Sequence, residues 1–234
     1  MAAVARSAPL HLRPAADLAE RCLLPGDPHR ALAVAQSLLE KPLMFNHARG
    51  LWGYTGLAPD GEPLTVQSTG MGGPSAAIVI EELIGLGAHR LVRIGTCGAL
   101  VAGFELGELV AARRVIAADG ASRAIGVSDP LVASAGLTAK LEDDGARGVT
   151  VVSTDLFYDT RTDVSGGWVR QGAEVVEMEA ATLLALAARE GLDAAVVLAV
   201  TDLLADGDRQ RIPVEALEGV GVRLGRAGYA ALSL

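Results

Sequence analysis

The chain has 234 residues, of which 50% are hydrophobic and only 3% aromatic, and its formal net charge is −8. This length and composition suit one large α/β domain or two small ones with an aliphatic core, and they exclude intrinsic disorder. The acidic balance argues against a nucleic-acid-binding surface, and no apolar run approaches the length of a membrane span.

The N-terminus and the cysteines indicate the compartment. Residues 1–20 lack the unbroken apolar segment of a signal peptide. The two cysteines, Cys22 and Cys97, sit in apolar contexts typical of reduced, buried thiols. Neither a disulfide framework nor a metal-type Cys/His spacing is present. We therefore expect a soluble cytoplasmic protein with no metal site.

Strands and helices alternate along the chain. Apolar runs predict strands at residues 21–24, 44–45, 51–57, 63–68, 91–94, 109–117, 148–153, 175–176 and 194–200. Helical patterns occupy residues 28–39, 74–86, 130–142, 168–171, 180–189 and 214–232, with loops at 95–98, 155–167 and 203–211. We predict one α/β domain over residues 1–234, with a central mixed, largely parallel β-sheet between two helical layers.

The turn after the first strand is a candidate anion site. Asp27 can cap a helix that begins at Pro28, so the free amide groups of the first turn point at one spot. Arg30 lies in that turn, where its charge opposes the helix dipole, and a bound anion would compensate. The alternative is an ordinary surface arginine. Gly26 in the same turn lets a ligand approach the backbone.

Two further loops carry glycine and small polar residues. The segment 70–75, GMGGPS, only half-resembles a dinucleotide fingerprint, so we reject an NAD site. Arg93 stands in an apolar strand, where a charge is costly unless it is paired. With Thr96 and the amides of the loop 95–98 it could surround one phosphate. The alternative is a pair between Arg93 and a structural carboxylate.

Carboxylates end two other strands. Glu177 and Glu179 stand where the strand 175–176 passes into a helix, at an edge of the sheet where ligands bind. The alternative to a ligand site is that the helix dipole simply favours acidic residues in the first turn. Asp202 ends the most apolar strand, where burial should raise its pKa and suit it to act as a general acid, unless it caps the next loop. Anion donors and carboxylates together suit a ligand set of a phosphate and a sugar.

These residues also carry a family resemblance. The segments 24–30 (LPGDPHR), 46–56 (NHARGLWGYTG), 70–75 (GMGGPS), 93–98 (RIGTCG), 176–181 (VEMEAA) and 201–202 (TD) occur in the order seen in nucleoside phosphorylases. The chain resembles the hexameric bacterial purine nucleoside phosphorylases from about His11 to the terminal helix. The resemblance implies phosphorolysis of purine (deoxy)ribonucleosides to free base and (deoxy)ribose 1-phosphate, in purine salvage.

The resemblance also implies a role for each site residue. Phosphate would be bound by Gly26, Arg30, Arg93 and Thr96, and by Arg49 of a neighbouring subunit. Ribose would be bound by Glu179, Met178 and Met71, and by His11 across a dimer interface. The base would lie against Cys97, Gly98, Phe157 and Glu177, and Asp202 would protonate purine N7.

The implied assembly is a homohexamer built as a trimer of dimers. Phosphate is a co-substrate, and no cofactor, nucleic acid or membrane is involved. The sequence departs from the family at residues 118–129, which look short, and in the loop after Asp202. In the relatives an arginine from the following helix swings towards the aspartate, and here Arg209 and Arg211 are both candidates.

Three other functions are compatible with parts of this pattern. Uridine phosphorylases carry a Gln and Arg pair after the position of Phe157, and residues 158–161 (YDTR) supply the Arg without the Gln. A nucleosidase of the methylthioadenosine type uses water and has no need for Arg30, Arg49 and Arg93 together. A non-catalytic nucleoside-binding protein would have lost the acid or the arginines, and here all are present. A purine nucleoside phosphorylase is therefore the preferred interpretation.

Overall fold

The fold is that of a computed structural model, which describes residues 8–126, 130–205 and 209–233. Parts of two segments that the sequence singled out lie outside the described residues. These are residues 127–129, at the end of the short segment 118–129, and residues 206–208, in the loop after Asp202.

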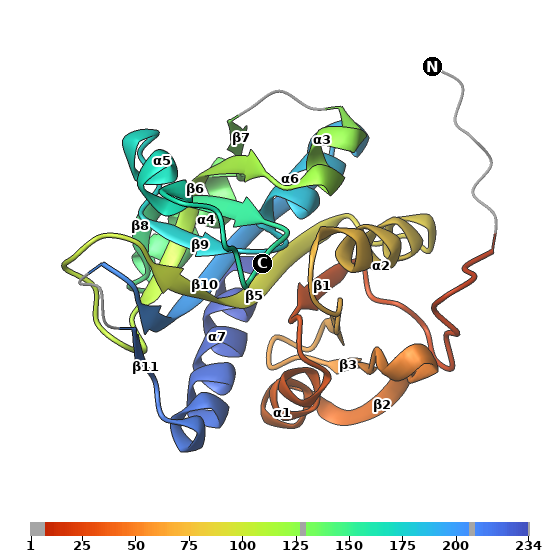
Figure 1. Ribbon diagram of the computed structural model, residues 1–234. Coiled ribbons are helices and arrows are strands. Elements are labelled where there is room, and N and C mark those ends of the chain that lie inside the picture. The colour runs from red at the N-terminus through yellow and green to blue at the C-terminus, as the bar shows by residue number, and fades with distance from the viewer. Residues whose placement is uncertain (1–7, 127–129, 206–208, 234) are drawn as a thin grey trace.

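An eleven-stranded sheet forms the centre of the described chain, as Figure 1 shows. Its strands are β1 (Arg21–Leu24), β2 (Glu40–Asn46), β3 (Gly53–Leu57), β4 (Pro63–Gln67), β5 (Arg90–Ala99), β6 (Leu109–Ala118), β7 (Leu131–Val132), β8 (Arg147–Thr154), β9 (Val175–Glu177), β10 (Asp193–Leu203) and β11 (Gln210–Arg211). Their order is β11-β10-β6-β8-β9-β5-β1-β4-β3-β2, with β7 beside β6.

The sheet closes on itself in the middle. Strand β10 pairs with β5 as well as with β6, so β5, β10, β6, β8 and β9 form a ring. The central pairs β1–β5, β5–β10, β6–β8 and β8–β9 are parallel, whereas β6–β10 and β5–β9 are antiparallel. The prediction of a central mixed sheet is confirmed.

Helices cover both faces of the sheet. They are α1 (Pro28–Leu38), α2 (Gly73–Gly85), α3 (Gly120–Ile125), α4 (Ala135–Asp143), α5 (Val164–Arg170), α6 (Ala180–Glu190) and α7 (Leu217–Leu232), with 3-10 turns η1 (Ala48–Gly50) and η2 (Val214–Ala216). Helices α1 and α4 pack on α7, while α2 and α3 pack on α6. None of the helices in the described ranges is long and apolar enough to cross a bilayer.

Two large aliphatic cores and one small cluster lie between the layers of the described chain, as the low aromatic content predicts. Buried Val79, Leu83 and Leu186 belong to the core under α2 and α6. Buried Val34 and Leu224 belong to the core under α1 and α7. Strand β10 is shared between them because its side chains alternate: Val196 faces the first core and Val197 the second.

Several predicted boundaries were wrong. Strand β5 does not end before a loop at 95–98 but continues to Ala99, because β10 pairs with it through this stretch. The predicted helix 130–142 is a short strand, β7, followed by α4. Helix α5 begins inside the predicted loop 155–167, α3 was not predicted, and β10 extends three residues beyond Val200.

Candidate active site

A cavity of about 880 Å³ opens where β1, β5, β9 and β10 end. This is the edge of an α/β sheet at which ligands commonly bind. All the predicted site residues except His11 and Arg49 line the cavity: Gly26, Arg30, Met71, Arg93, Thr96, Cys97, Gly98, Phe157, Glu177, Met178, Glu179 and Asp202. The fold therefore brings together residues from six separate stretches of the chain.

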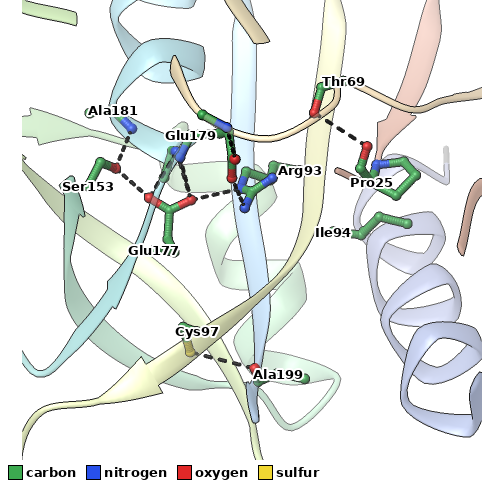
Figure 2. Close-up of polar contacts among 12 residues, drawn as sticks. Pro25, Thr69, Arg93, Ile94, Cys97, Ser153, Glu177, Glu179, Ala181 and Ala199 are labelled. Carbon is green, nitrogen blue, oxygen red and sulfur yellow. Dashed lines mark hydrogen bonds and ion pairs between the residues drawn. The ribbon is translucent and has the colours of Figure 1, made fainter. Parts of the chain in front are cut away.

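Arg93 lies at the buried floor of the cavity, on β5. Its Nε donates to Glu177 Oε2 at 2.9 Å, and its Nη2 pairs with Glu179 Oε2 (Figure 2). Burial opposes the charge, but the carboxylates of Glu179 and Glu177 raise the pKa of Arg93 above its ordinary value. A Cβ on Gly95 would come within 2.7 Å of Arg93 Nη2, so the glycine leaves room for the guanidinium.

The Nη1 atom of Arg93 is buried and has no hydrogen-bond partner among the described residues. An unpaired buried donor is costly, so an acceptor that reached this atom would be stabilised. The alternative given above for Arg93 was a pair with a structural carboxylate. That pair is present at Nε, which donates to Glu177. Arg93 is thus anchored by carboxylates and keeps one buried donor without a partner among the described residues.

Glu177 is held by the protein itself. Its carboxylate accepts from the amides of Glu179 and Ala180 at 2.9 Å, and from the hydroxyl of Ser153. These bonds satisfy the first free amides of α6, which is the usual role of a side-chain cap. Glu177 therefore fixes both the start of α6 and Arg93, and its predicted contact with a base stays a prediction.

Glu179 joins two parts of the cavity wall. Its Oε1 accepts from the amide of Gly72, and its Oε2 pairs with Arg93. Gly72 has a φ of 85°, which favours glycine and turns its amide towards the carboxylate. Burial raises the pKa of Glu179, Arg93 opposes that rise, and the like charge of Glu177 adds to it. Met178, beside it on the chain, is half-buried in the cavity wall.

Arg30 supplies a second positive charge. Asp27 caps α1 by accepting from His29 N at 2.9 Å, and Pro28 is the first helical residue, as predicted. Burial lowers the pKa of Arg30, and the nearby positive charge of Arg93 lowers it further, whereas the charge of Asp27 acts to raise it. Within the described ranges the only hydrogen bond of Arg30 is a long one, from Nη1 to Ile94 O at 3.5 Å. Arg30 has no ion pair among the described residues, and a half-buried guanidinium with so little compensation favours an anion in the cavity.

Asp202 lies on another wall of the cavity. The pairing of β10 with β5 shifts register between Val200 and Asp202, and the carboxylate is buried. Its Oδ2 accepts from Thr201 Oγ1 at 2.9 Å and its Oδ1 from Arg209 Nε at 2.8 Å. Arg211 Nε stays 3.7 Å from the same oxygen. Of the two candidate arginines, Arg209 is therefore the one in hydrogen-bonding contact.

Aromatic side chains border the mouth of the cavity. The Arg209 guanidinium lies over the Phe157 ring at 4.9 Å, and Phe157 meets Tyr158 edge-on at 5.0 Å. Phe157 is 52% exposed and Met71 is 85% exposed. These side chains therefore border the cavity rather than fill it. Buried Cys97 lies deeper, where burial raises the pKa of its thiol.

Some lining residues were not predicted. Asp159 and Arg161 form an ion pair at the cavity wall, with Arg161 Nε 2.9 Å from Asp159 Oδ1, and Trp168 of α5 lies near them. The sequence showed them only as a departure from the uridine phosphorylase pattern. Among the described residues, no cluster of three or more His, Cys, Asp or Glu side chains is arranged to hold a metal ion.

His11 and Arg49 lie outside the cavity of their own chain. His11 Nδ1 is 2.7 Å from Glu82 Oε1 on α2. Arg49 is exposed in the turn η1 with a φ of 60°, an unusual conformation for a residue other than glycine. The resemblance assigned both residues to a neighbouring subunit's site, and their places in a single chain leave that role open.

Comparison with known proteins agrees with this geometry. The family model described as "Phosphorylase superfamily" matches residues 20–230. A DeoD-type purine nucleoside phosphorylase of Caldanaerobacter subterraneus subsp. tengcongensis is 39% identical over 202 residues, covering 82% of this chain and 86% of the relative. Proteins of the same description are 38% identical in Jannaschia sp., over 80% of this chain and 84% of the relative, and 35% identical in Clostridium novyi, over 82% and 86%.

Proposed function

Because the chain belongs to the phosphorylase superfamily, we propose that its cavity catalyses the phosphorolysis of purine (deoxy)ribonucleosides. The enzyme is a purine nucleoside phosphorylase, a pentosyltransferase that releases the purine base and (deoxy)ribose 1-phosphate for salvage. The observation that carries this proposal is one cavity that holds two arginines, Arg30 and Arg93, together with the carboxylates of Glu179 and Asp202.

The phosphate subsite is the arginine end of the cavity. Arg30 and the free Nη1 of Arg93 donate to phosphate oxygens, and Thr96 and the backbone at Gly26 complete the site. Inorganic phosphate is the co-substrate, and its charge offsets the two partly desolvated guanidinium groups. Arg49 of a neighbouring subunit adds a third cation.

The ribose subsite is the junction of β9 and α6. Glu179 accepts hydrogen bonds from the ribose hydroxyls, while Met178 and Met71 pack against the sugar. The Met71 side chain is exposed in one chain, so a bound sugar would bury it. His11 of a neighbouring subunit meets the 5′-hydroxyl.

The base subsite is lined by Cys97, Gly98 and Phe157, with Glu177 behind them. A phosphate oxygen forms a bond to the anomeric carbon as the bond from that carbon to the purine breaks. The electron pair of the broken bond goes to the base, and Asp202 gives its proton to N7. General acid catalysis of this kind contributes about 10²–10⁴-fold.

Arg209 controls when Asp202 is an acid. Arg209 Nε donates a hydrogen bond to Oδ1, whereas donation to the base needs an Asp202 carboxyl that carries a proton of its own. Arg209 therefore has to move away from Oδ1 while Asp202 carries the proton. Its stacking on Phe157 links that movement to the base subsite.

The assembly is a homohexamer built as a trimer of dimers, and the enzyme works in the cytoplasm without a cofactor. The positions of His11 and Arg49, outside the cavity of their own chain, support sites shared between subunits. The free, buried thiols of Cys22 and Cys97 support a reducing compartment.

A substrate panel tests the activity. Adenosine, inosine and uridine are each incubated with the enzyme, with and without phosphate, and ribose 1-phosphate and free base are measured. We expect both products from purine nucleosides only when phosphate is present. Base release without phosphate would indicate a nucleosidase, preference for uridine would indicate a uridine phosphorylase, and no product from any nucleoside would leave a binding protein.

A further inference from the structure

We propose that Asn46 is a positioning residue that holds the segments carrying His11 and Arg49 in one rigid unit. The proposal rests on the proposed function, in which both residues serve a neighbouring subunit's site. Asn46 lies at the end of β2 and is fully buried. Buried amide side chains need partners, and those of Asn46 lie on two separate stretches of chain.

One set of contacts holds the N-terminal segment. Asn46 Oδ1 accepts from the amide of Arg13 at 2.9 Å. Glu82 on α2 holds the residues just before it: its carboxylate accepts from the amides of His11 and Leu12, at 3.0 and 2.7 Å, and pairs with the His11 ring. In Figure 1 this segment, coloured red, passes α2 and reaches the turn that follows β2.

The second set holds the turn η1. Asn46 Nδ2 donates to Leu51 O at 2.5 Å and, over a longer distance, to Ala48 O at 3.4 Å. Its Oδ1 also accepts from Ala48 N at 3.3 Å. From the other side, Gln67 Nε2 donates to Leu51 O at 3.0 Å. The turn is thus bound at both ends, before and after Arg49.

The conformation of Arg49 explains why such binding is needed. Its φ of 60° and ψ of 18° lie in the left-handed region, which costs an L-residue free energy and persists only where the surroundings impose it. The Arg49 side chain itself is exposed, so the constraint comes from the backbone contacts of its neighbours. The Asn46 amide contacts the turn on both sides of Arg49, at Ala48 and at Leu51, and it therefore sets the direction in which Arg49 leaves the surface.

A double-mutant cycle tests this role. We expect Asn46→Ala to raise the KM for phosphate about tenfold in the wild-type background, and less than about twofold in an Arg49→Ala background, because an effect that acts through Arg49 vanishes with it. The same comparison with His11→Ala follows the KM for the nucleoside. The control is Ser68→Ala, which truncates another buried polar side chain whose hydroxyl has no partner among the described residues, and which should leave both KM values unchanged.

The outcomes separate this inference from the proposed function. No ribose 1-phosphate from the wild-type enzyme would overturn the function. If the wild-type enzyme is active, two results would overturn the positioning role. One is an effect of Asn46→Ala that is undiminished in the Arg49→Ala background. The other is a lower Tm of Asn46→Ala with unchanged KM values. If Asn46→Ala does not fold, Gln67→Met takes its place, since it keeps the side-chain length and removes the donor to Leu51 O. An unchanged phosphate KM in that variant would likewise contradict the proposal.

Discussion

Asp202 shows how one residue depends on its position in the sheet. It lies near the end of β10, and a register shift against β5 stands just before it, where its carboxylate is buried in the wall of the cavity. The only cation in hydrogen-bonding contact with it among the described residues is Arg209, from the loop before β11. A buried acid with one removable partner is suited to a proton that must be carried and then given up.

Replacement of the acid is the sharpest test at this scale. We expect Asp202→Asn to lower kcat on adenosine by about 10²–10⁴-fold, since the amide cannot protonate N7, and to leave the KM for phosphate unchanged. The measurement is steady-state kinetics with both substrates varied. Arg211→Gln is the control, because Arg211 approaches the same carboxylate only at 3.7 Å and should have little effect. Full activity of Asp202→Asn on adenosine would remove Asp202 as the acid.

The sequence predicted the residues of the site better than their partners. Burial of Arg93 and Asp202 follows from apolar neighbours in the same strand, which are local in sequence. The bonds from Arg93 to Glu177, from Gly72 to Glu179 and from Arg209 to Asp202 join residues far apart along the chain or across a loop, and hydrophobic periodicity carries no information about them. The resemblance supplied what periodicity could not.

At the scale of elements, strand ends were the least predictable feature. Gly95, Thr96 and Gly98 look like a loop because glycine is unfavourable in isolated strands. In the sheet these residues pair with β10. The lack of a side chain at Gly95 makes room for Arg93, and the lack of one at Gly98 makes room for Leu204. Helix α1, by contrast, was predicted almost to the residue, because Asp27 and Pro28 are local start signals.

One ion pair joins elements at the far end of β1. Arg21 donates from Nη1 and Nη2 to the two carboxylate oxygens of Asp60, at 2.6 Å each, and from Nε to Pro63 O at 2.8 Å. It thereby ties β1 to the turn between β3 and β4. The Arg21 guanidinium lowers the pKa of Asp60 from 3.8 to about 2.

This pair predicts a pH-dependent stability. Because the folded-state pKa of Asp60 is lowered, its contribution is present above the unfolded value of 3.8 and is lost as the pH falls towards about 2. We expect Arg21→Met to reduce the free energy of unfolding at pH 7 by about 1–2 kcal/mol, with a smaller difference from wild type at pH 2.5. Urea unfolding at both pH values measures this.

A matched control separates this pair from surface charge in general. Arg113→Met removes an arginine that pairs with Glu142 at the surface, where solvent screens the interaction, and it should change stability little at either pH. A loss in Arg21→Met that is the same at pH 2.5 as at pH 7 would mean that packing of the Arg21 stem, and not its charge, stabilises the turn.

At the scale of the whole molecule, two of the predicted site residues lie away from the cavity of their own chain. Its cavity has Arg30, Arg93 and Asp202, whereas His11 and Arg49 project elsewhere. In a two-fold dimer the same surface of each subunit faces the other, so a residue that leaves one site can complete its partner's site. Activity would then belong to the assembly and not to the single fold.

Mixing two impaired variants tests whether sites are shared. Arg49→Ala and Asp202→Asn are each expected to be impaired. In a mixed dimer, the subunit with Arg49→Ala keeps its own Asp202 and receives Arg49 from the partner, so one of its two sites is intact. Random exchange of subunits at equal amounts should therefore restore about a quarter of the wild-type sites. The measurement is phosphorolysis after the two variants are unfolded and refolded together.

The control is a mixture of the same two variants that were folded separately, so that their subunits do not exchange. If Arg49 acts within its own chain, the refolded mixture has only the summed residual activities of the two variants, because no combination of subunits repairs either defect. Recovery only after exchange requires that phosphate be held by residues of two chains. It would also explain the contacts of Asn46 with Arg13 and Leu51. A segment that is already ordered in the free subunit loses less conformational entropy when it enters the site of another subunit.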